Sequence, residues 1–155
     1  MSEAAGPSLR PDYDAIIIGA GISGLYQLHR LRGLGLSVLV LEAGTGVGGT
    51  WYWNRYPGAR FDSESYSYGY SFSPELLADW NWTEHFAPQP ETLRYLNHVA
   101  DRFALRRDIR FHSRVSAAHY QSDGTWRVTL EDGSAFRARY LITAIGPLSA
   151  PTMPR

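Results

Sequence analysis

The chain has 155 residues, of which 44% are hydrophobic and 19% are charged, proportions typical of a globular domain and not of a disordered segment. Fifteen basic residues balance fifteen acidic ones without a basic run, so charge gives no reason to expect binding to nucleic acid or to a membrane surface. No segment approaches the ~18 apolar residues of a membrane span, no apolar N-terminal targeting region is found, and cysteine is absent, so we expect a soluble, cytoplasmic protein.

The first part of the chain predicts a strand, a helix and a second strand. The first strand is the short, β-branched run 14–18, which is typical of a strand buried on both faces of a parallel sheet. The second strand, 37–41, is closed by Glu42. The helix between them ends at a pair of glycines, and its apolar stripe consists of Leu25, Leu28, Leu31 and Leu34. This order is that of a βαβ unit.

Two further helices and three strands are expected after this unit. Ser73 followed by Pro74 has the composition of a capped helix start, and a stronger amphipathic helix begins at Pro90. From Ile109 the hydrophobic period changes to two, which indicates strands. The predicted strands are 109–120, 126–130 and 136–143, with turns at 122–124 and 131–133 and a buried run from Tyr140 to Gly146. We therefore predict an α/β fold with a Rossmann-like βαβ unit, a helical segment and an added antiparallel β-meander.

The sequence GAGISG fits the GxGxxG pattern at Gly19, Gly21 and Gly24. The first glycine allows a tight turn, the second lets the backbone approach a pyrophosphate, and the third permits close packing of helix on strand. Glu42 lies 23 residues beyond Gly19 (42 minus 19), where a carboxylate accepts hydrogen bonds from ribose hydroxyls and repels a 2′-phosphate. The unit therefore predicts FAD or NAD as ligand. The alternative is a glycine turn whose Glu42 is only solvated.

The segment GGTWYWNRYPGARFDSES, residues 48–65, has no evident use in a plain NAD dehydrogenase. Twelve of the 21 aromatic residues lie between Trp51 and Phe86, which indicates either a core or a wall around a flat ligand. Together with the glycine loop, the segment resembles the N-terminal part of flavin-dependent Baeyer–Villiger monooxygenases. The stretches SFSPELLADWNWTEHFAPQPETLRYLNHVADRFAL, FHSRVSAAHY and LITAIGPLSAPTMP also resemble that family, so the resemblance covers nearly all of residues 13–154.

The resemblance implies which residues bind the cofactor. The FAD pyrophosphate would lie against Gly19, Gly21, Ser23 and Gly24. The adenosine would meet Glu42 through its ribose and the backbone of Val115 through its adenine. The ribityl chain and flavin ring would lie along Gly49, Thr50 and Trp51, with Tyr68 at the border of the flavin pocket. Asp62 would be a catalytic residue close to the flavin and the nicotinamide, where the family pairs an aspartate with an arginine. The alternative for Asp62 is a purely structural role, as an acidic turn residue after Pro57-Gly58.

The implied activity is oxygenation of a small-molecule ketone to an ester or lactone, with FAD, NADPH and O2. The family's second glycine loop, its FxGxxxHTxxW signature and its catalytic arginine do not occur in these 155 residues. We therefore expect residues 1–12 to be a tail, 13–146 the first part of an FAD domain and 147–155 the start of a linker to a missing NADP domain, with no turnover by the fragment alone. An N- or S-oxygenating monooxygenase and a non-catalytic dinucleotide-binding module stay open as alternatives. The five histidines lack metal-ligand spacing, so no metal is expected.

Overall fold

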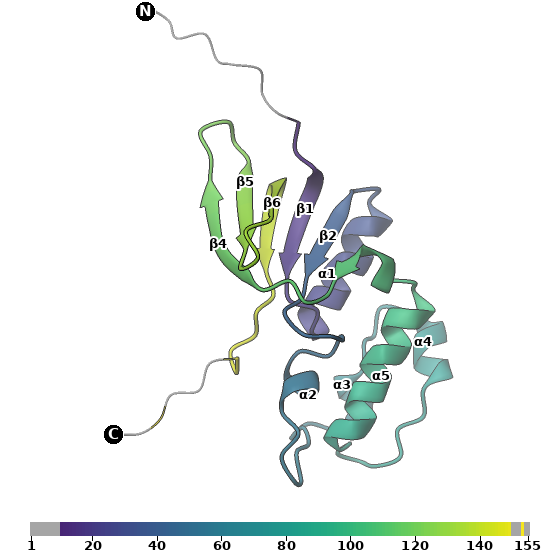
Figure 1. The fold of residues 1–155 in the computed structure, drawn as a ribbon. Helices are drawn as coiled ribbons and strands as arrows, with labels where there is room; N and C mark the ends of the chain where they lie inside the picture. Colours follow the sequence, from purple (N-terminus) through teal and green to yellow (C-terminus); the bar gives the residue numbers. More distant parts are fainter. Residues whose placement is uncertain (1–9, 150–152, 154–155) are drawn as a thin grey trace, which may run out of the picture.

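In the computed structural model, which describes residues 10–149 and residue 153, six strands form one mixed sheet (Figure 1). They are β1 (Tyr13–Ile18), β2 (Val38–Leu41), β3 (Ile109–Arg110), β4 (Val115–Tyr120), β5 (Trp126–Leu130) and β6 (Ala135–Thr143). Their order across the sheet is β3-β2-β1-β6-β5-β4. Strand β1 pairs in parallel with β2 and β6, whereas β4, β5 and β6 form an antiparallel meander. The predicted α/β class, with a βαβ unit and a meander, is confirmed.

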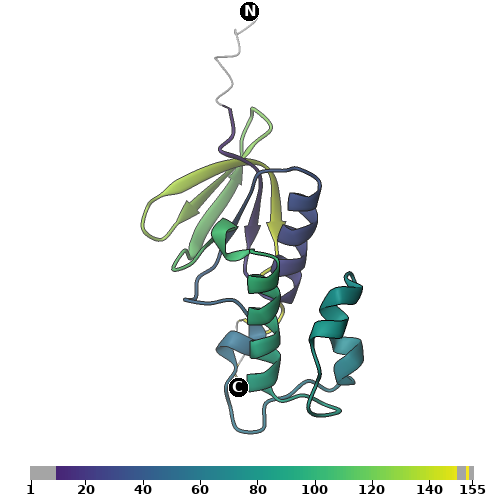
Figure 2. The ribbon, with the colours of Figure 1, turned by 90° about the vertical axis from the view of Figure 1, so that its right-hand side faces the viewer.

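The helix α1 (Ile22–Gly33) connects β1 to β2 and lies along one side of the sheet (Figure 2). Its Leu25 and Leu28 are buried in one cluster with Ile17 and Val40 of the two strands. A fully buried aliphatic side chain contributes roughly 1.5–3 kcal/mol, so this contact is a main source of stability. The helical stripe ends earlier than predicted. Leu34 follows the helix and is 69% exposed, because the chain turns away there.

The second face of β1 and β2 is covered by the meander. Ile16 of β1 and Leu41 of β2 belong to one buried cluster with Val128 and Leu130 of β5. Both faces of β2 are therefore buried along its whole length. This is why these strands have a continuous apolar run instead of an alternating pattern.

The single strand predicted over 109–120 is wrong. It is divided into β3 and β4, which lie at opposite edges of the sheet, and residues 111–114 carry the chain between them. His112 in this connection has a φ of 52°, outside the extended region. A period of two indicates extended backbone but not a change of partner strand, so the break left no signal. The buried run predicted from Tyr140 to Gly146 is also wrong, since none of its residues is buried, and Tyr140 in β6 and Ile145 after it are 55% and 60% exposed.

Along the sequence, four helices follow β2 and precede β3. In space they lie beyond the carboxyl ends of the parallel strands (Figures 1 and 2). They are α2 (Thr50–Trp53), α3 (Ser65–Tyr68), α4 (Pro74–Asp79) and α5 (Gln89–Arg102), and a 3-10 turn, Arg106–Asp108, follows them. The predicted cap of α4 is confirmed, because Ser73 Oγ accepts a hydrogen bond from the N–H of Leu76 at 3.2 Å. The helix α5 begins one residue before Pro90 and buries Leu96 and Val99. The four-residue helices α2 and α3 were not predicted.

The predicted tail and linker fall largely outside the described residues, which exclude 1–9, 150–152 and 154–155. Within the described part, regular structure runs from Tyr13 to Thr143. The domain boundaries at residues 13 and 146 therefore stay predictions. Over residues 10–149, no helix has the length and apolar character that crossing a membrane would require.

Candidate functional site

The glycine loop between β1 and α1 is in close contact with neighbouring backbone. A Cβ at Gly24 would lie 1.9 Å from the carbonyl oxygen of Gly19, so only glycine lets α1 approach the end of β1 this closely. This confirms the packing role predicted for the third glycine. A Cβ at Gly21 would lie 3.2 Å from the Cα of Gly49, which brings the loop against the residue before α2. The contact between these two glycines was not predicted.

Glu42 is a buried carboxylate, with only 5% of its surface exposed. Its Oε2 accepts a hydrogen bond from the N–H of Ala20 at 2.7 Å, and its Oε1 accepts one from the N–H of Gly44 at 2.7 Å. The N–H of Gly48 also donates to the carbonyl of Ala20 at 3.0 Å. Glu42 therefore joins the glycine loop to the segment after β2, and the alternative of a merely solvated Glu42 is wrong. Each carboxylate oxygen keeps a second lone pair, so the contact with a ribose stays a prediction.

The start of α1 leaves its first N–H groups without a side-chain cap. Gly21 is the N-cap residue, and no acidic residue lies in the first turn. Ser23, in that turn, is exposed. Unpaired N–H groups and the partial positive charge of a helix N-terminus suit a phosphate. A close-packed glycine loop followed by an uncapped twelve-residue helix fits the pyrophosphate of a dinucleotide.

Val115 begins β4 close to the segment that follows Glu42. The N–H of Ser113 donates to the carbonyl of Glu42 at 2.8 Å, and the N–H of His112 donates to the carbonyl of Gly44 at 3.0 Å. A cavity of about 330 Å³ lies beside these contacts, and it is lined by Ala43, His112, Arg114, Leu130, Glu131 and Asp132. Ala43 and Arg114 in this lining are the chain neighbours of Glu42 and Val115, the two residues predicted to meet the adenosine.

Trp51 and Tyr68 are joined by a hydrogen bond, and both pack against the ring of Phe61. The Trp51 Nε1–H donates to the Tyr68 hydroxyl at 2.8 Å. Phe61 stacks on Tyr68 with ring centroids 4.1 Å apart and meets Trp51 edge-on at 5.9 Å. Burial raises the pKa of Tyr68, and the nearby Asp62 carboxylate raises it as well. Tyr68 therefore stays protonated at neutral pH, and among the described residues its own O–H has no acceptor.

Asp62 is exposed, and within residues 10–149 no hydrogen bond or ion pair engages its carboxylate. It follows the buried Phe61, and it is near enough to Tyr68 for its charge to raise the pKa of that hydroxyl. Thr50 begins α2 right after Gly49, and this short helix links the aromatic group to the glycine loop. The structure thus brings Trp51, Asp62 and Tyr68 together. The remaining predicted residues gather around the ends of β1, β2 and β4.

Two buried polar residues near this group were not singled out in the sequence. Gln89 is 7% exposed, and its side-chain Nε2 donates to the carbonyl of Trp51. Ser65 is 2% exposed, and its Oγ accepts a hydrogen bond from the N–H of Ala87 at 3.0 Å. Serine and glutamine are common in exposed loops, so residue type gave no signal. Only their burial, at the first residues of α3 and α5, identifies them.

His29, Trp80 and Trp82 pack against other aromatic rings. His29 stacks on Phe72 with ring centroids 4.5 Å apart, and burial lowers its pKa. Trp80 and Trp82 both lie against Tyr95 of α5, so they contribute to packing. In the described part of the chain, no group of three or more histidine, aspartate or glutamate side chains could hold a metal ion.

A family model described as an NAD(P)-binding Rossmann-like domain matches residues 17–81. Three curated relatives match almost the whole chain. A 2-oxo-Δ3-4,5,5-trimethylcyclopentenylacetyl-CoA monooxygenase of Pseudomonas putida is 51% identical over 93% of the chain, and a Baeyer–Villiger monooxygenase of Pseudooceanicola batsensis is 48% identical over 93%. A phenazine N-monooxygenase of Lysobacter antibioticus is 46% identical over 92%. The chain spans only 27% of the length of each of them.

A solved structure of OTEMO in complex with FAD and NADP superimposes with a TM-score of 0.89 at 50% sequence identity. The match covers 94% of this chain and 28% of that one. The chain therefore shares the fold of that region of the OTEMO structure.

Proposed function

Because the chain belongs to the Baeyer–Villiger monooxygenases, as the FAD-binding region at their N-terminal end, we propose that it binds FAD within an NADPH- and O2-dependent enzyme that inserts oxygen into ketones. The products are esters or lactones. The observation that carries this proposal is the exposed, unpartnered carboxylate of Asp62 beside Trp51 and Tyr68. Such a group makes no hydrogen bond or ion pair in the described residues, and Trp51 lies on α2, which follows the glycine that contacts the glycine loop.

The glycine loop and the sheet ends hold the phosphate and adenosine parts of FAD in this proposal. Gly19, Gly21, Ser23 and Gly24 surround the pyrophosphate with backbone N–H groups. Glu42 accepts hydrogen bonds from the ribose while it continues to bind Ala20 and Gly44. The adenine occupies the cavity beside Val115. Both carboxylate oxygens of Glu42 are fixed by backbone, so the ribose meets a preorganised acceptor.

The aromatic group forms the flavin side of the site. Gly49, Thr50 and Trp51 lie along the ribityl chain and the ring, and Tyr68 directs its unused O–H at the ligand. Bound FAD supplies hydride acceptance and the activation of O2. Asp62 orients an arginine guanidinium of the whole enzyme through a charge-assisted hydrogen bond, and that guanidinium faces the negative charge that develops during oxygen insertion.

FAD binding by the chain tests the first part of the proposal. Titration of the folded 155-residue chain with FAD, followed by flavin fluorescence, should reach saturation at one equivalent. Glu42→Gln should weaken binding about tenfold, which corresponds to roughly 1.4 kcal/mol. The matched variant Glu75→Gln, at the exposed start of α4, should bind as the parent does. A folded chain that shows no saturable FAD binding contradicts the proposal.

One observation favours a second candidate, because the phenazine N-monooxygenase is nearly as similar to the chain as the two other relatives. The whole protein should distinguish the two activities when it is supplied with NADPH, O2 labelled with ¹⁸O, and either a cyclic ketone or an aromatic N-heterocycle. A labelled lactone supports ketone oxygenation. A labelled N-oxide without any lactone favours the second candidate.

A further inference from the structure

We propose that Ser65 and Arg60 are positioning residues, which hold Asp62 in place by fastening the chain on both sides of it to residues 84–88. The inference rests on the proposed function, because that function requires a carboxylate at a fixed position. It extends that function by naming the residues that hold this carboxylate in place. We call residues 84–88 the supporting segment.

Ser65 fastens the chain after Asp62. Its hydroxyl donates to the carbonyl of Glu84 at 2.6 Å and accepts from the N–H of Ala87 at 3.0 Å. The N–H of Ser65 donates to the carbonyl of His85 at 2.8 Å. Since Ser65 is 2% exposed, water cannot replace these contacts easily. The side chain and the backbone N–H of Ser65 therefore connect the start of α3 to the supporting segment at three points.

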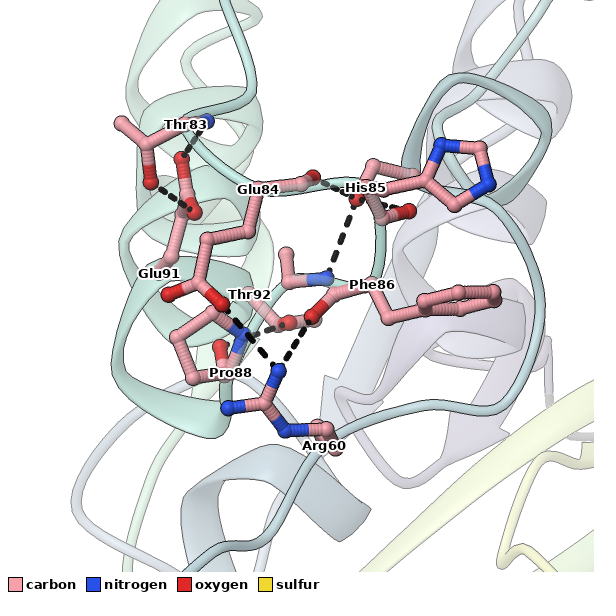
Figure 3. A network of polar contacts seen from close by, with 10 residues as sticks. Arg60, Thr83, Glu84, His85, Phe86, Pro88, Glu91 and Thr92 are labelled. Atoms are coloured by element: carbon pink, nitrogen blue, oxygen red, sulfur yellow. Dashed lines mark hydrogen bonds and ion pairs between the residues drawn. The ribbon is translucent and has the colours of Figure 1, made fainter.

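Arg60 fastens the chain before Asp62. Its Nη1 donates to the carbonyl of Phe86 at 3.0 Å and to Glu84 Oε2 at 3.1 Å, as Figure 3 shows. Its backbone pairs with Pro88 in an isolated antiparallel bridge. The guanidinium reaches across to the supporting segment, so the side chain and the backbone of Arg60 act on the same partner.

The supporting segment is itself tied to the core. Glu91, on the first turn of α5, is 2% exposed and accepts hydrogen bonds from the N–H of Thr83 at 2.9 Å and from its hydroxyl at 2.7 Å (Figure 3). The N–H of Gln89 donates to the carbonyl of Ala59 at 2.8 Å. The supporting segment is therefore fixed relative to α5. Because Arg60 and Ser65 bind to it, residues 60–65 are fixed relative to α5 as well.

Within the described residues, Asp62 has no hydrogen bond or ion pair of its own that could fix it. Its neighbour Phe61 is held by the rings of Trp51, Tyr68 and Trp82. The carboxylate is therefore located by Phe61 on one side and by Ser65 on the other. A displacement of about 1 Å in a reacting group can lower a rate about 100-fold. Removal of the Ser65 hydroxyl should release residues 62–64 from the supporting segment.

The absence of cysteine allows a direct measurement of this effect. Asp62→Cys creates a single attachment site for a nitroxide spin label, and the electron paramagnetic resonance spectrum of the FAD-loaded chain reports the mobility of residue 62. Ser65→Ala and Arg60→Met, each combined with Asp62→Cys, should give a more mobile spectrum. The matched control is Ser67→Ala, which removes only an exposed hydrogen bond to the carbonyl of Glu64. It should leave the spectrum unchanged.

Circular dichroism establishes that each variant is folded, and Arg60→Met carries the test if Ser65→Ala does not fold, because Arg60 is exposed. Unchanged label mobility in a folded Ser65→Ala or Arg60→Met chain overturns the proposal. Failure to bind FAD would instead contradict the proposed function, since label mobility is measurable without the cofactor. In the whole enzyme, Ser65→Ala should lower turnover about 10- to 100-fold at unchanged FAD affinity. In the double variant, Ser65→Ala should lower turnover little beyond the loss that Asp62→Asn causes alone. If the losses of turnover of the two single variants add in full, the proposal is also overturned.

Discussion

Glu42 and Asp62 are both predicted to contact the cofactor, yet the structure gives them opposite surroundings. Glu42 is 5% exposed and binds two backbone N–H groups at 2.7 Å. Asp62 is exposed and has no polar partner in the described part of the chain. The first carboxylate holds two loops together, and so it stabilises the fold whether or not a ligand is bound. The second makes no hydrogen bond or ion pair with the described part of the fold, so its role is the one proposed for it in the whole enzyme.

The difference extends to the segments that carry them. The glycine loop around Glu42 is fixed by backbone contacts that tolerate no added atom, as at Gly24. The chain around Asp62 is fixed by side chains, namely the ring of Phe61 and the hydroxyl of Ser65. Substitutions near Glu42 should therefore lower stability, and substitutions near Asp62 should lower activity more than stability.

Gly24→Ala should have the largest effect on stability. The added Cβ would lie 1.9 Å from the carbonyl oxygen of Gly19, so α1 must move away from β1. We expect the free energy of unfolding, measured with urea, to fall by roughly 3 kcal/mol or more. Gly33→Ala on the same helix meets no atom within 4 Å and should raise it by up to about 1 kcal/mol. Equal stability of the two variants would contradict the close approach of helix and strand.

Glu42→Gln should have the next largest effect. The amide keeps one acceptor but turns an NH2 group toward the N–H of Ala20 or Gly44, which leaves one buried donor unpaired. The expected loss of unfolding free energy is about 1.5–3 kcal/mol. Glu131→Gln, at the exposed hairpin turn, should change it by less than about 0.5 kcal/mol. If the two variants behave alike in urea, Glu42 does not hold the loops together.

Tyr70 connects the two regions, because its hydroxyl donates to the carbonyl of Ile22 in α1 at 2.5 Å. Burial raises the pKa of Tyr70, and burial also raises that of Tyr95. A raised pKa in the folded state means that the neutral form is favoured there. The stability that these residues contribute is fully present below the ordinary tyrosine pKa of about 10 and is lost as the pH rises above it.

Tyr70→Phe tests this connection. At pH 7 the variant should lose about 1 kcal/mol of unfolding free energy through the missing hydrogen bond. Above pH 10 its stability should fall less steeply than that of the parent, because phenylalanine has no proton to release. Tyr120→Phe, on the exposed strand β4, should retain the alkaline loss of the parent. Denaturation at pH 7, 9, 10 and 11 measures both effects, and parallel curves for Tyr70→Phe and the parent would refute the prediction.

The glycine loop and the acid at the end of β2 could be predicted from the sequence, because residue types at fixed spacing identify them. A strand, three spaced glycines, a helix and an acid at the end of the next strand leave few alternatives. The region of Asp62 depends on contacts between segments some twenty residues apart, such as Ser65 with Ala87 and Arg60 with Phe86. No local pattern encodes such contacts, and only the family resemblance pointed to Asp62.

The errors in the predicted fold have the same origin. Leu34 continues the helical spacing but lies past the last turn of α1, so it is exposed. The strand predicted over 109–120 pairs with β2 up to Arg110 and with β5 from Val115 on. Alternation of apolar and polar residues does not indicate which strand is the partner. Periodicity reports the local shape of the backbone. It does not report which surface the chain meets next.

Asp62→Asn should have the smallest effect on stability and separates the two carboxylates most sharply. No partner in the described residues is lost, so the unfolding free energy should change by less than about 0.5 kcal/mol. The negative charge that raises the pKa of Tyr68 disappears, so the pKa of Tyr68 should fall in the variant. In the whole enzyme, oxygenation should decrease about 100-fold, because a neutral asparagine cannot form an ion pair with a guanidinium. Urea denaturation, together with product formation at saturating NADPH, measures both quantities. A loss of stability as large as that of Glu42→Gln would mean that Asp62 has a structural role after all, and the distinction between the two carboxylates would not hold.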